Sequence, residues 1–117
     1  MIVYTSRTGN VKHIVNQLNL PNVELREGLI ISQPYILFTY TDGLGSSPRI
    51  VEEFLDTNDK YIKGIIVSGN VNFGEFYCKP AEVISERYNI PIVRKIDLRG
   101  TDQDVKEIIK QYNDILR

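Results

Sequence analysis

The hydrophobic and polar positions of this chain follow two periodicities that alternate along the sequence. Five segments show the apolar runs or the alternation typical of β-strands: 2–4, 23–26, 35–40, 62–67 and 90–98. Four segments carry apolar residues at the spacing of an amphipathic helix: 11–18, 48–58, 79–88 and 101–116. Strands that alternate with helices predict an α/β fold with a mainly parallel sheet and helices on both faces.

The sequence defines the ends of these helices to different degrees. Ser47 can cap a helix that has Pro48 at its first position. Thr101 and Asp104 have the spacing of a capping box, with Asp in place of the usual Glu. Pro80 leaves two alternatives: it lies in the first turn of its helix, or a kinked turn precedes that helix.

Three polar loops rich in glycine and hydroxyl side chains follow predicted strands. They are Thr5–Asn10, Thr41–Ser47 and Ser68–Gly74. In open α/β sheets, ligands bind outside the carboxyl ends of the strands, where the strand order reverses. In a flavodoxin-type order the three loops converge on one rim, which predicts a single composite binding site.

The first loop joins a strand to a helix, where backbone N–H groups and the positive end of the helix dipole face one spot. Ser6, Thr8 and Asn10 add side-chain donors, and Gly9 allows close approach of the backbone. Such a nest can bind a phosphate dianion with little need for Lys or Arg. A plain strand–helix turn capped by Asn or Thr fits the same residues, so this loop alone leaves both interpretations open.

The second and third loops favour a flat and partly apolar ligand. Glycines let backbone groups reach ring edges, while aliphatic and aromatic side chains cover ring faces. A phosphate joined to a planar heterocycle is a mononucleotide, and flavin mononucleotide (FMN) fits this combination best. The sequence lacks a GxxxxGK[ST] nucleotide loop and the paired acidic residues of a response regulator after the first strand.

Composition and charge argue against several other classes. The 117 residues are 42% hydrophobic and carry a net charge of −1, which suits one domain over residues 1–117 and gives no basis for nucleic-acid or membrane-surface binding. No targeting or spanning segment is evident, so we expect a cytoplasmic protein. Cys78 and His13 stand alone, so neither a disulfide nor a His/Cys metal site is expected. We expect Cys78 to be buried and His13 to be exposed.

The loops resemble those of a known family. Their sequences closely resemble NrdI, the short flavodoxin-like activator of class Ib ribonucleotide reductase, in these segments: Ser6–Val11, Thr39–Gly45 with Pro48, and Ser68–Gly74. Later segments also look like that family: Tyr88, Pro91-Ile92 and Leu98–Thr101. The resemblance implies a flavodoxin-like three-layer sandwich whose parallel sheet has the strand order 2-1-3-4-5.

The resemblance also implies a function. It predicts an FMN protein that activates the small, dimanganese subunit of class Ib ribonucleotide reductase and is not a stand-alone enzyme. In that family an unidentified reductant reduces the flavin, and the reduced flavin gives electrons to O2. The oxidant, taken to be superoxide, reaches the Mn(II) pair, and a tyrosyl radical forms in the partner.

Matched loop by loop, the resemblance assigns the flavin to all three loops. The phosphate would be held by Ser6, Arg7, Thr8, Gly9, Asn10 and Val11. The ring would be bordered by Tyr40, Thr41, Asp42, Gly43 and Leu44, with the Gly43 peptide near N5. The pyrimidine side would be completed by Ser68, Gly69, Asn70, Asn72, Phe73 and Gly74.

Three positions depart from the family pattern. Leu44 stands where many members have an aromatic residue, and Phe73 replaces a frequent Trp, so both give weaker stacking. Asp42 stands where Thr is common and puts a carboxylate near the ring. We expect that charge to disfavour the anionic reduced flavin and to lower the second reduction potential.

Two other functions fit the same rim. A general electron-transfer flavodoxin is usually longer and markedly acidic, whereas this chain is short and nearly neutral. A non-redox module that holds a phosphorylated metabolite would lack a flavin altogether. For the leading hypothesis, we expect the docking face to surround the flavin edge, on the Thr41–Ser47 and Val71–Tyr77 loops.

Overall fold

The structure, a computed structural model, describes residues 1–116 and is built on one five-stranded parallel sheet. The strands are β1 (Ile2–Tyr4), β2 (Asn22–Glu24), β3 (Tyr35–Tyr40), β4 (Ile62–Gly69) and β5 (Ile92–Asp97). The helices are α1 (Asn10–Leu18), α2 (Arg49–Asn58), α3 (Lys79–Tyr88) and α4 (Asp102–Leu116), with short 3₁₀ helices η1 (Asp59–Tyr61) and η2 (Val71–Phe76). The order β2-β1-β3-β4-β5 and the helices on both faces confirm the predicted flavodoxin-like sandwich.

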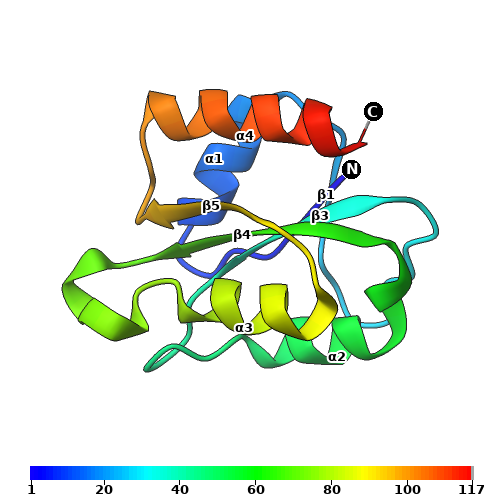
Figure 1. The fold of residues 1–117 in the computed structure, drawn as a ribbon, viewed down its shortest axis with the longest axis horizontal. Helices are drawn as coiled ribbons and strands as arrows, with labels where there is room; N and C mark the ends of the chain where they lie inside the picture. Colours follow the sequence, from blue (N-terminus) through cyan, green and yellow to red (C-terminus); the bar gives the residue numbers. More distant parts are fainter. Residues whose placement is uncertain (117) are drawn as a thin grey trace.

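Side chains that alternate along the central strands build two separate apolar layers. Ile36 and Phe38 of β3 face the layer shared with α1 and α4, whereas Tyr35 and Leu37 face the layer shared with α2 and α3. Figure 1 shows this arrangement, with α1 and α4 above the sheet and α2 and α3 below it. Because all four side chains are fully buried, the continuous apolar run of β3 reflects a strand covered on both faces.

The strand boundaries differ from the sequence pattern at both edges of the sheet. β2 spans Asn22–Glu24 and not 23–26, although the N–H of Leu25 still donates to the carbonyl of Tyr4 at 2.7 Å. The prediction that the last strand runs from Ile90 to Leu98 is wrong, because β5 spans Ile92–Asp97. Leu98 has a φ of 55°, in the left-handed region, so the chain turns there.

The predicted helix ends have mixed outcomes. Ser47 does not cap α2, because the residue before the helix is Pro48 and no side chain bonds there. The capping box at Thr101 and Asp104 is confirmed: the N–H of Thr101 donates to Oδ2 of Asp104 at 2.7 Å, and the N–H of Asp104 donates to Oγ1 of Thr101 at 3.3 Å. α3 begins at Lys79 with a proline in its first turn, which decides between the two alternatives.

The parallel strands all end at one edge of the sheet, which positions the site. In Figure 1 this edge lies at the left, where the chain leaves β4 for η2. The loops after β1, β3 and β4 meet there, as expected of a sheet whose order reverses between β1 and β3. Within residues 1–116, no helix combines the length and apolar character needed to cross a membrane.

Candidate functional site

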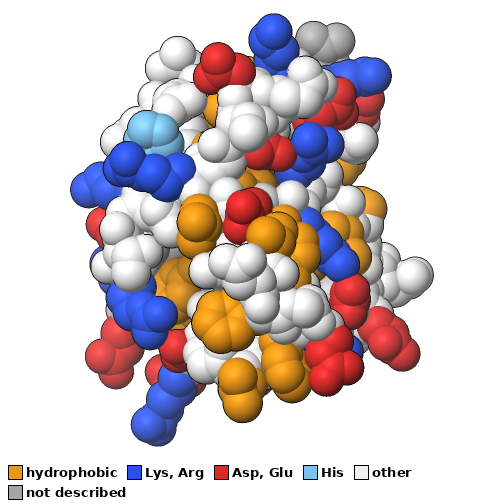
Figure 2. Space-filling view, turned by 90° about the vertical axis from the view of Figure 1, so that its left-hand side faces the viewer, with side chains coloured by type: hydrophobic (Ala, Val, Ile, Leu, Met, Phe, Trp, Pro, Cys, Tyr) orange, Lys and Arg blue, Asp and Glu red, His pale blue; other side chains and the backbone are white. Residues whose placement is uncertain are grey.

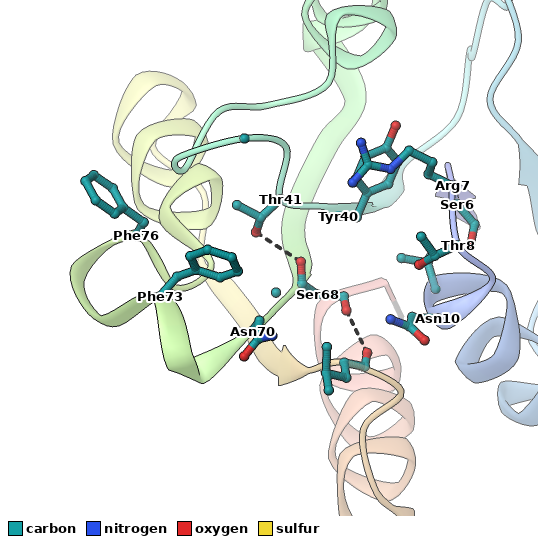
Figure 3. A pocket seen from close by; sticks show the side chains of 14 residues that line it. Ser6, Arg7, Thr8, Asn10, Tyr40, Thr41, Ser68, Asn70, Phe73 and Phe76 are labelled. Atoms are coloured by element: carbon teal, nitrogen blue, oxygen red, sulfur yellow. Dashed lines mark hydrogen bonds between the residues drawn. The ribbon is translucent and has the colours of Figure 1, made fainter.

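A cavity of about 170 Å³ lies at the carboxyl edge of the sheet, among the three polar loops. Twelve residues predicted from the sequence line it: Ser6, Arg7, Thr8, Asn10, Val11, Tyr40, Thr41, Gly43, Ser68, Gly69, Asn70 and Phe73. Figure 3 shows the hydroxyl and amide side chains of the first loop on one side and Phe73 on the opposite side, with Thr41 and Ser68 between them. The structure therefore brings together a polar wall and an aromatic wall.

Five predicted residues do not line the cavity in this structure. Gly9 precedes α1, and the Asp42 carboxylate is paired with Arg7. Leu44 is 69% exposed at the rim. Asn72 and Gly74 lie in η2, whose start is capped by Asn70: Oδ1 of Asn70 accepts from the N–H of Asn72 at 2.9 Å.

The first loop presents free backbone donors. The N–H groups of residues 6–11 have no protein acceptor within the described chain, whereas the N–H of Lys12 donates to Oγ of Ser6 at 3.3 Å. The N-cap position of α1 is Gly9, which has a φ of 92° and no side chain with which to cap the helix. An Asn- or Thr-capped turn is thereby ruled out. A run of unpaired N–H groups at a helix N-terminus is the geometry that binds a phosphate.

An ion pair links the first loop to the second. Nη1 of Arg7 lies 3.0 Å from Oδ1 of Asp42, and Cζ of Arg7 lies 5.2 Å from the centroid of the Tyr40 ring. The second loop is itself closed by two backbone hydrogen bonds of 2.8 Å between Asp42 and Ser46. The carboxylate predicted near the ring is therefore partly neutralised by a cation from the neighbouring loop.

The floor of the cavity is held by hydrogen bonds around the end of β4. Oγ1 of Thr41 donates to the carbonyl of Ser68 at 3.0 Å, and Oγ of Ser68 donates to the carbonyl of Leu98 at 2.6 Å. A Cβ on Gly69 would lie 3.0 Å from the backbone nitrogen of Cys78 and 3.1 Å from Oγ1 of Thr41. A side chain at this position would force its neighbours to move by a few tenths of an ångström, because the loops after β3 and β4 close tightly around Gly69.

Two lining residues were not among the predicted site residues. Leu98 was assigned to a strand because it continued the alternation of the last strand, and Phe76 was placed only within the Val71–Tyr77 loop expected to dock the partner. The signal for Leu98 was available, since the fourth loop at the carboxyl edge also follows a strand and contains Gly100. Phe76 gave no such signal, because its place depends on how η2 turns.

Apolar side chains surround the mouth of the cavity. Leu44, Val71, Phe73 and Leu98 are between 45% and 69% exposed. Figure 2 shows apolar side chains gathered on this face of the molecule, with a few charged groups among them. Such an exposed cluster is typical of a ligand or partner contact.

The remaining candidate chemistry is structural. Cys78 is fully buried, as expected, its thiol donates to the carbonyl of Val67 at 3.2 Å, and burial raises its pKa. His13 is exposed, as expected, and its Nε2 lies 2.8 Å from Nε2 of Gln17. Among residues 1–116 no group of three His, Cys, Asp or Glu side chains could hold a metal ion.

The residues present fit a flavin. The unpaired N–H groups of the first loop match a phosphate, the backbone-lined floor matches the polar edge of a ring, and Phe73 and Tyr40 match its faces. This fit rests on the free N–H groups of the first loop and on the aromatic side chains that line the cavity.

Comparisons with known proteins agree with this geometry. The family model described as "NrdI Flavodoxin like" matches residues 2–110. Protein NrdI of Macrococcus caseolyticus (strain JCSC5402) is 39% identical over 108 residues, which cover 92% of this chain and 84% of that protein. A solved short-chain flavodoxin associated with a bacterial microcompartment has a TM-score of 0.75 at 17% identity, and the match covers 97% of this chain and 93% of that one. The last match shows the fold alone, and the first two show that the chain belongs to the NrdI flavodoxin-like family of flavoproteins.

Proposed function

We propose that this protein binds FMN at the carboxyl edge of its sheet and activates the small, dimanganese subunit of class Ib ribonucleotide reductase in the cytoplasm. The observation that carries the proposal is the run of unpaired N–H groups over residues 6–11 beside a cavity with an aromatic wall. The family supplies the link to the reductase, and the site supplies the fit to a phosphorylated flavin.

Each loop has a distinct part in holding the cofactor. The N–H groups and hydroxyls of the first loop would bind the phosphate, with the N-terminus of α1 adding its dipole. Backbone groups at Gly43 and Gly69 would meet the ring edge, and Tyr40 and Phe73 would cover its faces. When bound and reduced, the flavin supplies electrons to O2, and the oxidant that results serves the Mn(II) pair of the partner.

The apolar rim suits a contact that excludes water. Leu44, Val71 and Phe73 protrude around the cavity mouth, and they belong to the two loops expected to dock the partner. A partner seated on them would cover the ring edge and shield the oxidant's path from solvent.

The first experiment is the visible absorption spectrum of the purified protein after incubation with FMN and gel filtration. A flavin spectrum that co-elutes with the protein supports the proposal, and a colourless protein contradicts it. Riboflavin is the matched ligand, because it lacks only the phosphate; we expect it to bind more weakly than FMN.

The second experiment tests the partnership. The photoreduced FMN protein, O2 and a Mn(II)-loaded small subunit are mixed, and the tyrosyl radical is measured by electron paramagnetic resonance. The control omits this protein and supplies free reduced FMN. Absence of the radical, together with efficient one-electron transfer to another acceptor, would identify a general electron-transfer flavodoxin.

A further inference from the structure

Arg7 leaves the first loop and reaches the second. Its guanidinium lies 3.0 Å from Asp42 and 5.2 Å from the centroid of the Tyr40 ring. Figure 3 shows the Arg7 side chain over Tyr40, apart from the group formed by Ser6, Thr8 and Asn10. The charge of this arginine therefore lies with the loop expected to border the ring, although its backbone belongs to the loop expected to bind the phosphate.

The phosphate subsite does not require this cation. The N–H groups of residues 6–11 are free, and the hydroxyls of Ser6 and Thr8 lie among them. Neutral donors in such a nest are sufficient for a phosphate dianion. Arg7 lines the cavity and Asp42 does not, so the arginine is the member of the pair that faces the ligand.

We propose that Arg7 is a positioning residue of the ring subsite, held on Tyr40 by Asp42, and that it does not bind the phosphate. These three residues form a clasp that joins the phosphate loop to the ring loop. The inference rests on the proposed function, because it takes FMN as the ligand. It assigns Asp42 the role of anchoring Arg7, in addition to any direct effect of its charge.

The clasp is solvated, which limits the size of its effect. The Arg7 and Asp42 side chains are 58% and 43% exposed, and exposed ion pairs change an equilibrium by about two- to fivefold at most. A direct hydrogen bond from arginine to phosphate would instead be worth roughly tenfold or more, since charged hydrogen bonds are stronger. The two roles are therefore separable by magnitude and by ligand.

The decisive measurement compares FMN with riboflavin. Dissociation constants are obtained by fluorescence quenching for the wild type, Arg7→Gln and Thr8→Ala, in moderate salt so that long-range attraction is screened. We expect Arg7→Gln to weaken the binding of FMN and of riboflavin by the same two- to fivefold, so that the ratio of the two affinities is unchanged. Thr8→Ala, the positive control, lowers the FMN-to-riboflavin ratio. A tenfold fall of that ratio in Arg7→Gln would overturn the proposal.

A double-mutant cycle tests whether Asp42 acts through Arg7. Riboflavin is the probe, because it is neutral and does not respond to a general change of charge. We expect Asp42→Asn to weaken the binding of riboflavin when Arg7 is present and to have no further effect in the Arg7→Gln background. The conservative variant Asp42→Glu should keep the riboflavin affinity of the wild type. Additive losses, or no loss in Asp42→Asn, would contradict the anchoring role.

The reduction potential of bound flavin, measured beside a control variant, separates a positioning role of Arg7 from a general loosening of the fold. Arg49→Gln removes one positive charge, as Arg7→Gln does, and breaks the Arg49–Glu53 pair of 3.0 Å on α2, away from the lining residues; it is the charge-matched control. We expect Arg7→Gln, but not Arg49→Gln, to lower the reduction potential of bound flavin, because a cation beside the ring favours the reduced form. An unchanged potential in Arg7→Gln refutes the clasp. Failure of the wild type to bind either flavin would refute the proposed function itself.

Discussion

Replacement of Asp104 by alanine removes one carboxylate that has two structural roles. Oδ2 accepts hydrogen bonds from the N–H of Thr101 at 2.7 Å and from its hydroxyl at 3.1 Å, which completes the cap of α4. Oδ1 accepts from Nε of Arg94 at 2.8 Å, which ties α4 to β5. The side chain is 11% exposed, and that of Arg94 is 33% exposed, so water replaces these partners poorly.

The magnitude follows from these contacts. Loss of a helix cap costs about 1 kcal/mol. Loss of a partly buried, charge-assisted bond to Arg94 adds roughly 1–2 kcal/mol, because the guanidinium also loses its acceptor. We therefore expect Asp104→Ala to lower the free energy of unfolding by about 2–3 kcal/mol. For a domain of this size, that corresponds to a fall in melting temperature of roughly 8–12 °C.

The effect depends on pH in a direction set by the pKa of Asp104. Burial by itself raises this pKa, but hydrogen bonds from Arg94 and Thr101 outweigh burial, and the net pKa lies below its ordinary value. A carboxylate with a lowered folded pKa stabilises the protein above its unfolded pKa of about 4, and the contribution is lost as the pH falls through the folded pKa. The wild type and Asp104→Ala therefore differ fully at neutral pH and converge in acid.

The assay is urea unfolding followed by circular dichroism at neutral pH and at several acidic pH values. Asp102→Ala, an exposed residue in the first turn of the same helix, is the matched control and should change stability by less than about 1 kcal/mol. Equal losses in the two variants, or a difference for Asp104→Ala that grows in acid, would refute the reasoning.

Three further substitutions test the site and its support. Asp42→Thr should raise the second reduction potential of bound flavin, because it removes a negative charge that Arg7 only partly offsets; an unchanged potential would sink that hypothesis. Gly69→Ala should lower both the melting temperature and flavin affinity, since its Cβ would lie 3.0 Å from the backbone of Cys78; wild-type values in both assays contradict this. Asn58→Ala should lower the free energy of unfolding in urea by about 2–3 kcal/mol, because the buried amide accepts from the N–H of Ile31 at 2.8 Å and donates to the carbonyl of Leu29 at 3.0 Å. A loss below about 0.5 kcal/mol would show that these bonds do not hold the 29–31 loop.

Much of the fold is local in origin and could be predicted from the chain alone. The apolar run of Tyr35–Tyr40 requires cover on both faces, and helical spacing over Val11–Leu18 supplies part of that cover. The Thr101 and Asp104 capping box is also local, because its hydrogen bonds join residues three apart. Periodicity and short-range hydrogen bonds thus gave the elements and their order.

Strand ends and loop contacts were less accessible. Leu98 continues the apolar alternation, yet its backbone turns to a φ of 55° because its N–H donates to Gly69 and its carbonyl accepts from Ser68. Ser47 has the chemistry of a cap, but the second loop is instead closed by backbone bonds between Asp42 and Ser46. The turn at Leu98 depends on the neighbouring strand β4, and the closure of the second loop depends on backbone groups, so the pattern of side chains represents neither outcome.

By itself, the sequence determined that three polar loops end strands of one parallel sheet and that the first loop offers backbone donors. Only the tertiary structure decided which donors stay free and where each charge lies. It left the N–H groups of residues 6–11 unpaired, and it placed the Arg7 guanidinium 3.0 Å from Asp42, across a separation of 35 residues. The physical reason is that periodicity reports which face of an element is buried, whereas the partner of a long polar side chain is set by loops that meet only after the sheet has formed.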